Sequence, residues 1–168
     1  MNTILKAAEF ARKAHAEQKR RYSGLPYVVH PARVAGRVAA HPLATEAMVA
    51  AAFLHDVVED TPHTLEEVCA EFGSEVARLV EELTNPSVGS GDPRRDRKQQ
   101  DREHLSKVSV QAKIIKLLDR IDNLGDMPTT ASEFPQRYCE ESRLLVEMIG
   151  DADPQLRAEL LDIVERLA

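Results

Sequence analysis

One segment of the chain is apolar on every side of the helix that it would form, and this limits the folds open to the chain. The segment ATEAMVAAAFLHDVVED occupies residues 44–60, and a helix this apolar normally lies at the centre of a bundle. Its last turn nevertheless contains four ionisable residues, His55, Asp56, Glu59 and Asp60. Buried charges persist when they are paired or bound to a metal. The segment therefore predicts a central helix that ends in a polar site.

The rest of the sequence predicts more helices and no β-strand. Apolar residues make up 43% of the 168 residues but aromatic residues only 4%, so Ala, Leu and Val dominate, and the first two favour helix. Hydrophobic periodicity, with capping residues and breakers, locates the helices. They are expected at about residues 3–20, 31–40, 64–73, 74–84, 109–125, 136–149 and 154–167. We predict an all-α bundle of about eight helices.

Several helix ends carry recognisable signals. Thr64 followed by Glu67 is the pattern of a capping box. Proline is favoured at the first helical position, which we expect for Pro31 and Pro154. Side chains that accept hydrogen bonds from the first turn are expected at Asn2 or Thr3, Thr45, Ser74 and Ser109.

Length and charge limit the organisation and the partners. A chain of 168 residues fits one domain, and the stretch 85–93 is expected to be a flexible loop within it, because it is too short to link two domains. The net charge of −6 argues against a nucleic-acid polymer as partner. Membrane and signal segments are not apparent, and Cys69 and Cys139 are expected to be buried free thiols. A cytoplasmic location is the resulting expectation.

The adjacent pair His55-Asp56 is the strongest chemical signal. An imidazole nitrogen and a carboxylate oxygen within one turn suit a divalent ion such as Mn²⁺, Fe²⁺ or Zn²⁺. A helix C-terminus that emerges into solvent would also tolerate these charges. Carboxylates there oppose the helix dipole by about 0.3–1 kcal/mol each, however. A bound cation removes that objection, so we favour a metal site.

Two further residues are ambiguous when taken alone. Asp119 interrupts an apolar series in KIIKLLDRIDNL, and Asn123 follows one turn later on the same face. Taken alone, Asp119 is more typical of a structural residue that pairs with Arg120 or caps a neighbouring element than of a metal ligand. His30, just before Pro31, is by itself more typical of a structural histidine than of a ligand.

Together, these residues resemble the H…HD…D signature of the HD phosphohydrolase superfamily, with His30, then His55-Asp56, then Asp119. Over about residues 4–127 the chain is similar to the hydrolase domain of the RelA/SpoT family and to the stand-alone small alarmone hydrolases. The motifs that carry the similarity are AxxFAxxAH, RYSGLPYVVHPxxVA, FLHDVVEDT, FGSEVARLVEELT and KLLDRIDNL. The resemblance implies the HD-domain helical bundle as the fold.

The resemblance also implies an activity and a set of site residues. The family hydrolyses the 3′-pyrophosphate of guanosine tetra- or pentaphosphate with Mn²⁺. By similarity, the metal ligands are His30, His55, Asp56 and Asp119, and the pair Glu59 and Asp60 positions and deprotonates the attacking water. Asn123 corresponds to a residue near the ribose and 3′-phosphate, and Arg21 to a basic residue of the nucleotide pocket.

Other residues bear on the substrate. Tyr22 stands where relatives often carry a second basic residue. Tyr22 and Asp122 flank the nucleotide pocket that the resemblance implies, so they affect which base and how many phosphates the substrate carries. In the charged run of residues 94–102, one or two side chains are expected to contact phosphate, and most of the run to be a solvated helix face. The candidates are Lys98, Arg102, Arg94, Arg95 and Arg97.

Three functions remain open from the sequence. The first is an alarmone pyrophosphohydrolase without a synthetase domain. The second keeps the site but changes the substrate to an adenine alarmone, a nucleoside monophosphate or another phosphoester. The third is a catalytically silent nucleotide-binding module, against which the intact ligands and the acidic pair argue. An exposed apolar face on the last two helices would indicate a homodimer.

Overall fold

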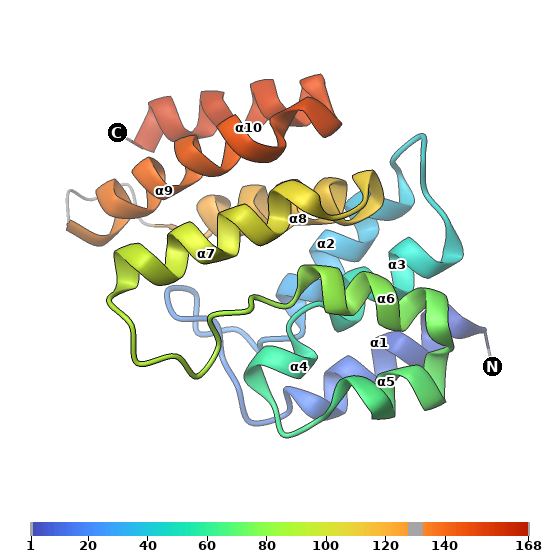
Figure 1. Ribbon diagram of the computed structural model, residues 1–168. Coiled ribbons are helices and arrows are strands. Elements are labelled where there is room, and N and C mark those ends of the chain that lie inside the picture. The colour runs from blue at the N-terminus through green and yellow to red at the C-terminus, as the bar shows by residue number, and fades with distance from the viewer. Residues whose placement is uncertain (1, 128–132, 168) are drawn as a thin grey trace. The chain divides into compact units, whose positions relative to one another are not determined.

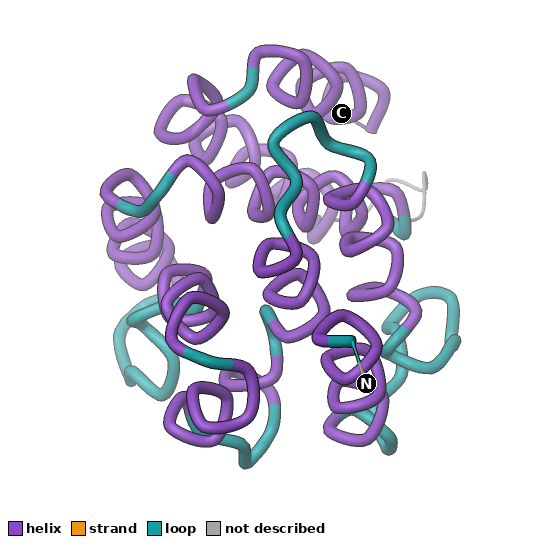
Figure 2. Tube along the Cα trace, turned by 90° about the vertical axis from the view of Figure 1, so that its right-hand side faces the viewer, coloured by secondary structure: helices purple, strands orange, loops and turns teal. Residues whose placement is uncertain are grey.

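The computed structural model describes residues 2–127 and 133–167, and the chain divides into two compact units, Met1–Thr84 and Asn85–Ala168. Over these described ranges the chain forms ten α-helices and one 3₁₀ helix, with no β-strand beyond an isolated bridge between Lys19 and Pro26 (Figures 1 and 2). The all-α prediction is confirmed. None of the helices in the described ranges is both long and apolar enough to cross a bilayer.

The first unit is built around α3, as its apolar sequence predicts. Residues 47–52 and Leu54 of this helix are buried, and α3 packs against α1, α2 and α6. Thr45 caps α3 by accepting a hydrogen bond from the Met48 N–H at 3.2 Å. The helices of this unit are α1 (Thr3–Ala14), α2 (Val29–Ala39), α3 (Glu46–Leu54), α4 (Val57–Asp60), α5 (Leu65–Phe72) and α6 (Ser74–Leu83).

The first helix is shorter than expected, because it ends at Ala14 and not near residue 20. The backbone beyond it pairs with a later part of the chain. The Tyr27 N–H donates to the Gln18 carbonyl at 2.9 Å, and the Arg20 N–H donates to the Leu25 carbonyl at 2.8 Å. These bonds close a loop over residues 18–27. Helical periodicity cannot reveal such pairing, since it reports only on neighbours along the helix.

The expected continuous helix over residues 45–60 is interrupted at His55-Asp56. Helix α3 ends at Leu54 and α4 begins at Val57, although the Asp60 N–H still bonds to the Asp56 carbonyl at 2.9 Å. The break accounts for one of the helices beyond the expected eight. The other is α7, which hydrophobic periodicity did not locate because its charged sequence lacks an apolar stripe, although most of the run 94–102 was expected to form a solvated helix face.

The second unit contains α7 (Arg94–Lys107), α8 (Val110–Gly125), α9 (Glu133–Ile149), η1 (Gly150–Ala152) and α10 (Pro154–Leu167). Helix α8 supplies the largest share of the core residues of this unit, among them Ile114, Leu117 and Ile121, and it packs against α9 and α10 (Figure 1). Pro154 is the first residue of α10, as predicted.

Three smaller expectations were wrong. Pro31 is the third residue of α2, because the helix already begins at Val29. The N-cap of α6 is Gly73, whose φ of 86° suits a residue without a side chain, and Ser74 is the first helical residue. Cys69 is a free thiol but exposed, whereas Cys139 is free and buried.

The N-terminus of α5 offers a test of local stability. Thr64 Oγ1 accepts from the Glu67 N–H at 3.3 Å, and the Glu67 carboxylate accepts from the Thr64 N–H at 3.0 Å. Thr64→Ala removes the acceptor of the Glu67 N–H and is expected to lower the free energy of unfolding by about 1 kcal/mol. Ser74→Ala is the matched control, because the Ser74 side chain does not cap α6. Equal urea-denaturation midpoints for the two variants would contradict this account.

Candidate metal centre and active site

Three side chains of the first unit converge on one point. His30 Nε2 lies 3.2 Å from His55 Nε2, and Asp56 Oδ2 lies 3.1 Å from His55 Nε2 and 3.6 Å from His30 Nε2. Both histidines are buried, and Asp56 is mostly buried. The structure thus brings together three of the four ligands expected from the sequence.

Packing of α2 on α3 brings these residues together. His30 is the second residue of α2, while His55 and Asp56 form the break after α3. His55 Nδ1 lies 2.8 Å from the Ala52 carbonyl oxygen, which can only accept. This bond places the proton of the neutral imidazole on Nδ1 and leaves a lone pair on Nε2, the atom that faces His30 and Asp56.

The spacing of the three atoms fits a divalent metal ion. Bonds of roughly 2.1 Å from a metal to nitrogen or oxygen require neighbouring ligand atoms to be about 3.0–3.4 Å apart. Two of the three observed separations, 3.1 and 3.2 Å, lie in this range, and the third, 3.6 Å, is slightly longer. Two imidazoles and a carboxylate are the mixed ligand set favoured by Mn²⁺, Fe²⁺ and Zn²⁺.

Tyr27 supports the site, and the sequence reading did not single it out. Its hydroxyl donates to Asp56 Oδ2 at 2.6 Å, and its ring lies between those of His15 and His30, with centroids at 4.8 and 5.8 Å. A hydrogen bond of this kind orients a carboxylate ligand. The available signal was its position three residues before His30, inside the motif RYSGLPYVVHP.

Glu59 and Asp60, the expected acidic pair, lie on α4 directly after the three converging side chains. Asp60 is exposed as a whole residue, yet neighbouring groups desolvate its carboxyl and raise its pKa. The negative charge of Asp56 raises this pKa further, whereas His15, Tyr27 and His55 oppose the increase. A carboxylate with a raised pKa is a better proton acceptor than an ordinary aspartate.

Asp119 lies on α8 of the second unit, where it is buried. Its Oδ1 accepts from Asn123 Nδ2 at 2.6 Å, and its Oδ2 pairs with Lys116 Nζ at 2.9 Å. Arg120, the partner considered from the sequence, donates to Ser142 Oγ and lies over the ring of Tyr138. The ligand role of Asp119 and the substrate role of Asn123 stay predictions.

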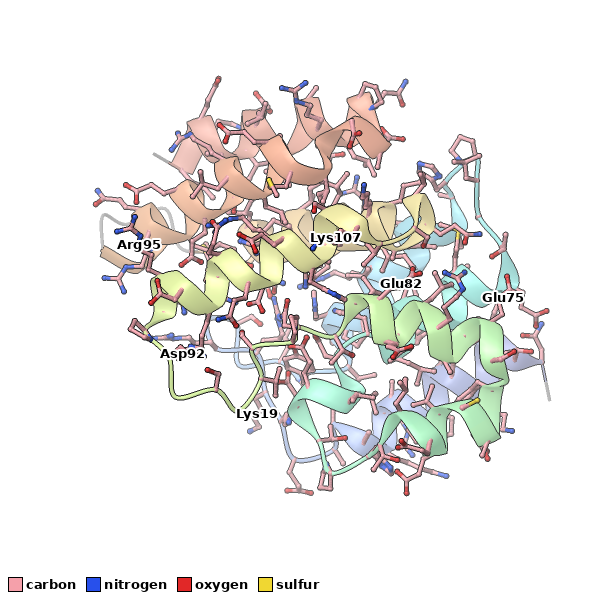
Figure 3. All side chains as sticks on the ribbon, viewed as in Figure 1. Lys19, Glu75, Glu82, Asp92, Arg95 and Lys107 are labelled. Atoms are coloured by element: carbon pink, nitrogen blue, oxygen red, sulfur yellow. The ribbon has the colours of Figure 1, made fainter. Side chains whose placement is uncertain are left out.

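The basic run of residues 94–102 lies on α7. Figure 3 labels Arg95 near the start of this helix and Lys107 at its end. Lys98 pairs with Asp101 at 3.1 Å, and Arg102 donates to Gln99 at 2.8 Å. A cavity of about 370 Å³ opens beside this run. It is lined by Arg94, Arg95, Lys98, Arg102, Arg137, Glu140, Glu141 and Leu144. The contribution of Arg137 from α9 could not be read from the sequence.

Arg21 and Tyr22 lie in the loop between α1 and α2, and both are exposed. The guanidinium of Arg21 lies over the ring of Tyr22, 5.7 Å from its centroid. Their proposed contact with nucleotide stays a prediction.

Comparison with known proteins decides the family. A family model described as an HD domain matches residues 7–146. The chain belongs to the HD-domain family. Among curated relatives of this HD-domain chain is guanosine-3′,5′-bis(diphosphate) 3′-pyrophosphohydrolase MESH1 of Mus musculus, which is 39% identical over 96% of this chain and 93% of that protein. The protein of the same name from Homo sapiens is 38% identical, over 94% of this chain and 90% of its own length.

A solved structure agrees with these sequence relatives. It is described as a metazoan ortholog of SpoT that hydrolyses ppGpp, and it matches 99% of this chain and 96% of its own with a TM-score of 0.88 and 29% identity. The resemblance of the sequence to the HD superfamily and to RelA/SpoT-type hydrolases is confirmed by these matches.

Proposed function

We propose that the chain is a Mn²⁺-dependent pyrophosphohydrolase that converts guanosine tetra- or pentaphosphate and water into GDP or GTP and pyrophosphate. The observation that carries the proposal is the convergence of His30 Nε2, His55 Nε2 and Asp56 Oδ2 within 4.8 Å of one another. The names of the relatives, at 38–39% identity over nearly the whole chain, supply the substrate. Fe²⁺ and Zn²⁺ suit the same ligands, so the choice of Mn²⁺ rests on the family resemblance.

The residues of the chain divide the work of hydrolysis. A bound divalent ion lowers the pKa of a water molecule and polarises a phosphoryl oxygen. Asp60, with its raised pKa, accepts the proton of the attacking water, and Glu59 helps to hold that water in place. The leaving pyrophosphate carries high negative charge, for which Arg21 and the basic side chains of α7, among them Lys98 and Arg102, are suitable donors.

The substrate assignment is tested with a panel of nucleotides. Metal-free protein is loaded with Mn²⁺ and incubated with guanosine tetraphosphate, guanosine pentaphosphate, an adenine alarmone and nucleoside monophosphates, and the products are separated by chromatography. We expect equal amounts of pyrophosphate and GDP from the tetraphosphate, and loss of turnover with a chelator. Turnover of another phosphoester with none of the guanosine substrates would replace the proposed substrate but keep the site.

Asp119 is proposed as the fourth metal ligand, and it has its own test. Asp119→Asn preserves shape but removes the charge, so we expect bound Mn²⁺ per chain to fall and the dissociation constant to rise at least about tenfold. Asp162→Asn is the control, because it removes an exposed carboxylate that pairs only at the surface with Arg166. Titration calorimetry with Mn²⁺ compares the two. Unchanged Mn²⁺ affinity in Asp119→Asn would limit Asp119 to its ion pair with Lys116.

A further inference from the structure

His15 is a buried histidine that none of the proposed roles uses. It follows α1, only 2% of the residue is exposed, and its ring packs against that of Tyr27. Its Nδ1 lies 2.7 Å from Oε1 of Gln18, and Nε2 of Gln18 donates to the backbone carbonyl of Asp60 at 2.8 Å. One side-chain amide therefore connects His15 to the residue that ends α4.

The direction of each hydrogen bond follows from chemistry. The Asp60 carbonyl can only accept, so the nitrogen of the Gln18 amide must face it and the amide oxygen must face His15. An amide oxygen is also only an acceptor, so His15 Nδ1 carries a proton and donates. In the neutral imidazole, Nε2 is then an acceptor.

The environment of His15 Nε2 is unfavourable for a polar atom, which argues against a role in packing alone. His15 Nε2 is buried and has no hydrogen-bond partner among residues 2–127 and 133–167. Burial of an unpaired polar atom is unfavourable, and a leucine or phenylalanine of similar size would avoid that cost. Packing alone therefore does not explain a histidine here, whereas the donor at Nδ1 does.

We propose that His15 is a positioning residue of the hydrolytic site, which acts through Gln18 to fix Asp60. The inference rests on the proposed function, because it gives Asp60 the role of proton acceptor. Gln18, from the loop after α1, bonds to the backbone of Asp60 at the end of a four-residue helix, while the carboxyl group of Asp60 is hydrogen-bonded to Tyr27. The bond from Gln18 therefore fixes the backbone position from which this carboxyl group extends. A displacement near 1 Å at a reacting group is enough to lower turnover about 100-fold.

Two substitutions of His15 test the roles of its two ring nitrogens one at a time. The amide nitrogen of asparagine can replace Nδ1, so His15→Asn retains a donor toward Gln18. Glutamine reaches the Nε2 position, so His15→Gln loses that donor while it remains polar. Gln18→Met keeps the length of the side chain but removes both hydrogen bonds. His41→Asn is the control, since His41 accepts from the Leu43 N–H in the turn after α2.

The experiment measures kcat and KM for guanosine tetraphosphate, Mn²⁺ per chain and the melting temperature of each full-length variant. We expect His15→Gln and Gln18→Met to lower kcat about 10- to 100-fold, with KM and Mn²⁺ content within about twofold of wild type. His15→Asn should recover most of the lost kcat. Combining His15→Gln with Gln18→Met should cost no more than Gln18→Met alone, because both break one connection.

Other outcomes overturn the inference. Wild-type kcat in Gln18→Met, or equal losses in His15→Asn and His15→Gln, would show that the connection to Asp60 is not used. Gln18 is only half-buried, so its variant supports the test even if a His15 variant does not fold. Turnover by wild-type protein separates the two proposals. Its absence overturns the proposed function and this inference together, whereas its presence with an unaffected Gln18→Met overturns the inference alone.

Discussion

Asp56→Ala is expected to abolish Mn²⁺ binding and to lower kcat/KM for guanosine tetraphosphate by about 10³-fold or more. The substitution removes the only charged member of the converging trio in the first unit, and leaves two buried imidazoles 3.2 Å apart. The ion contributes several kcal/mol of transition-state stabilisation, and about 1.4 kcal/mol corresponds to a factor of ten in rate. Metal analysis after dialysis, with steady-state kinetics, measures both effects.

The same variant gives a readout that does not depend on the substrate. A ligand that binds only the folded state stabilises it by about 2.7 kcal/mol at one hundred times its dissociation constant. Mn²⁺ should therefore raise the melting temperature of wild-type protein and of Asp60→Asn, but not that of Asp56→Ala. A variant without Asp56 that still gains thermal stability from Mn²⁺ and still turns over would rule out the proposed centre.

The Asp60→Asn variant is expected to bind Mn²⁺ as wild-type protein does but to have a much lower kcat. Removal of a general base typically costs a factor of about 10²–10⁴ in kcat, and the amide preserves the shape of the side chain. Glu59→Gln is the matched comparison, because it neutralises the neighbouring acid on the same short helix. A smaller loss in Glu59→Gln than in Asp60→Asn would identify Asp60 as the proton acceptor, and the reverse order would assign that role to Glu59.

The pH dependence gives a second measure of Asp60. The base must be ionised, so turnover falls as the pH drops through its pKa. Desolvation is the largest of the causes that raise that pKa above the ordinary aspartate value of 3.8. The second cause, the charge of Asp56, would be offset by a bound Mn²⁺, so the prediction for the loaded enzyme rests on desolvation. The acid limb of wild-type kcat should therefore lie at higher pH than for an ordinary carboxylate. This limb should disappear from the residual activity of Asp60→Asn, and its persistence there would assign it to another group.

Local signals in the sequence were sufficient for much of the fold. Thr45, Thr64 and Ser109 act as N-caps as expected, since a cap depends on residues only two or three positions away. The central place of α3 followed from its composition, because a helix that is apolar on all sides has to be covered. The adjacency of His55 and Asp56 in sequence predicted that both lie at the end of the central helix. Neighbouring side chains on a regular helix point in different directions, however, and these two approach each other where the helix is interrupted between α3 and α4.

Tertiary structure decided which residues that are far apart in the sequence come into contact. His30 joins His55 because α2 packs on α3, and the sequence offered this only through a family resemblance. The end of α1 at Ala14, the contact of Tyr27 with Asp56 and the connection from His15 to Asp60 all depend on the closed loop over residues 18–27.

The physical reason for this difference is the distance along the sequence over which each interaction acts. Helix propensity, capping and periodicity act between residues a few positions apart, so the sequence by itself determined which segments are helical and which one is central. A loop that pairs with itself, or a ligand supplied by another helix, gains its free energy from contacts between residues far apart in sequence. The partners in those contacts are set only when the helices pack, and for this protein that packing assembled the candidate metal centre of the first unit.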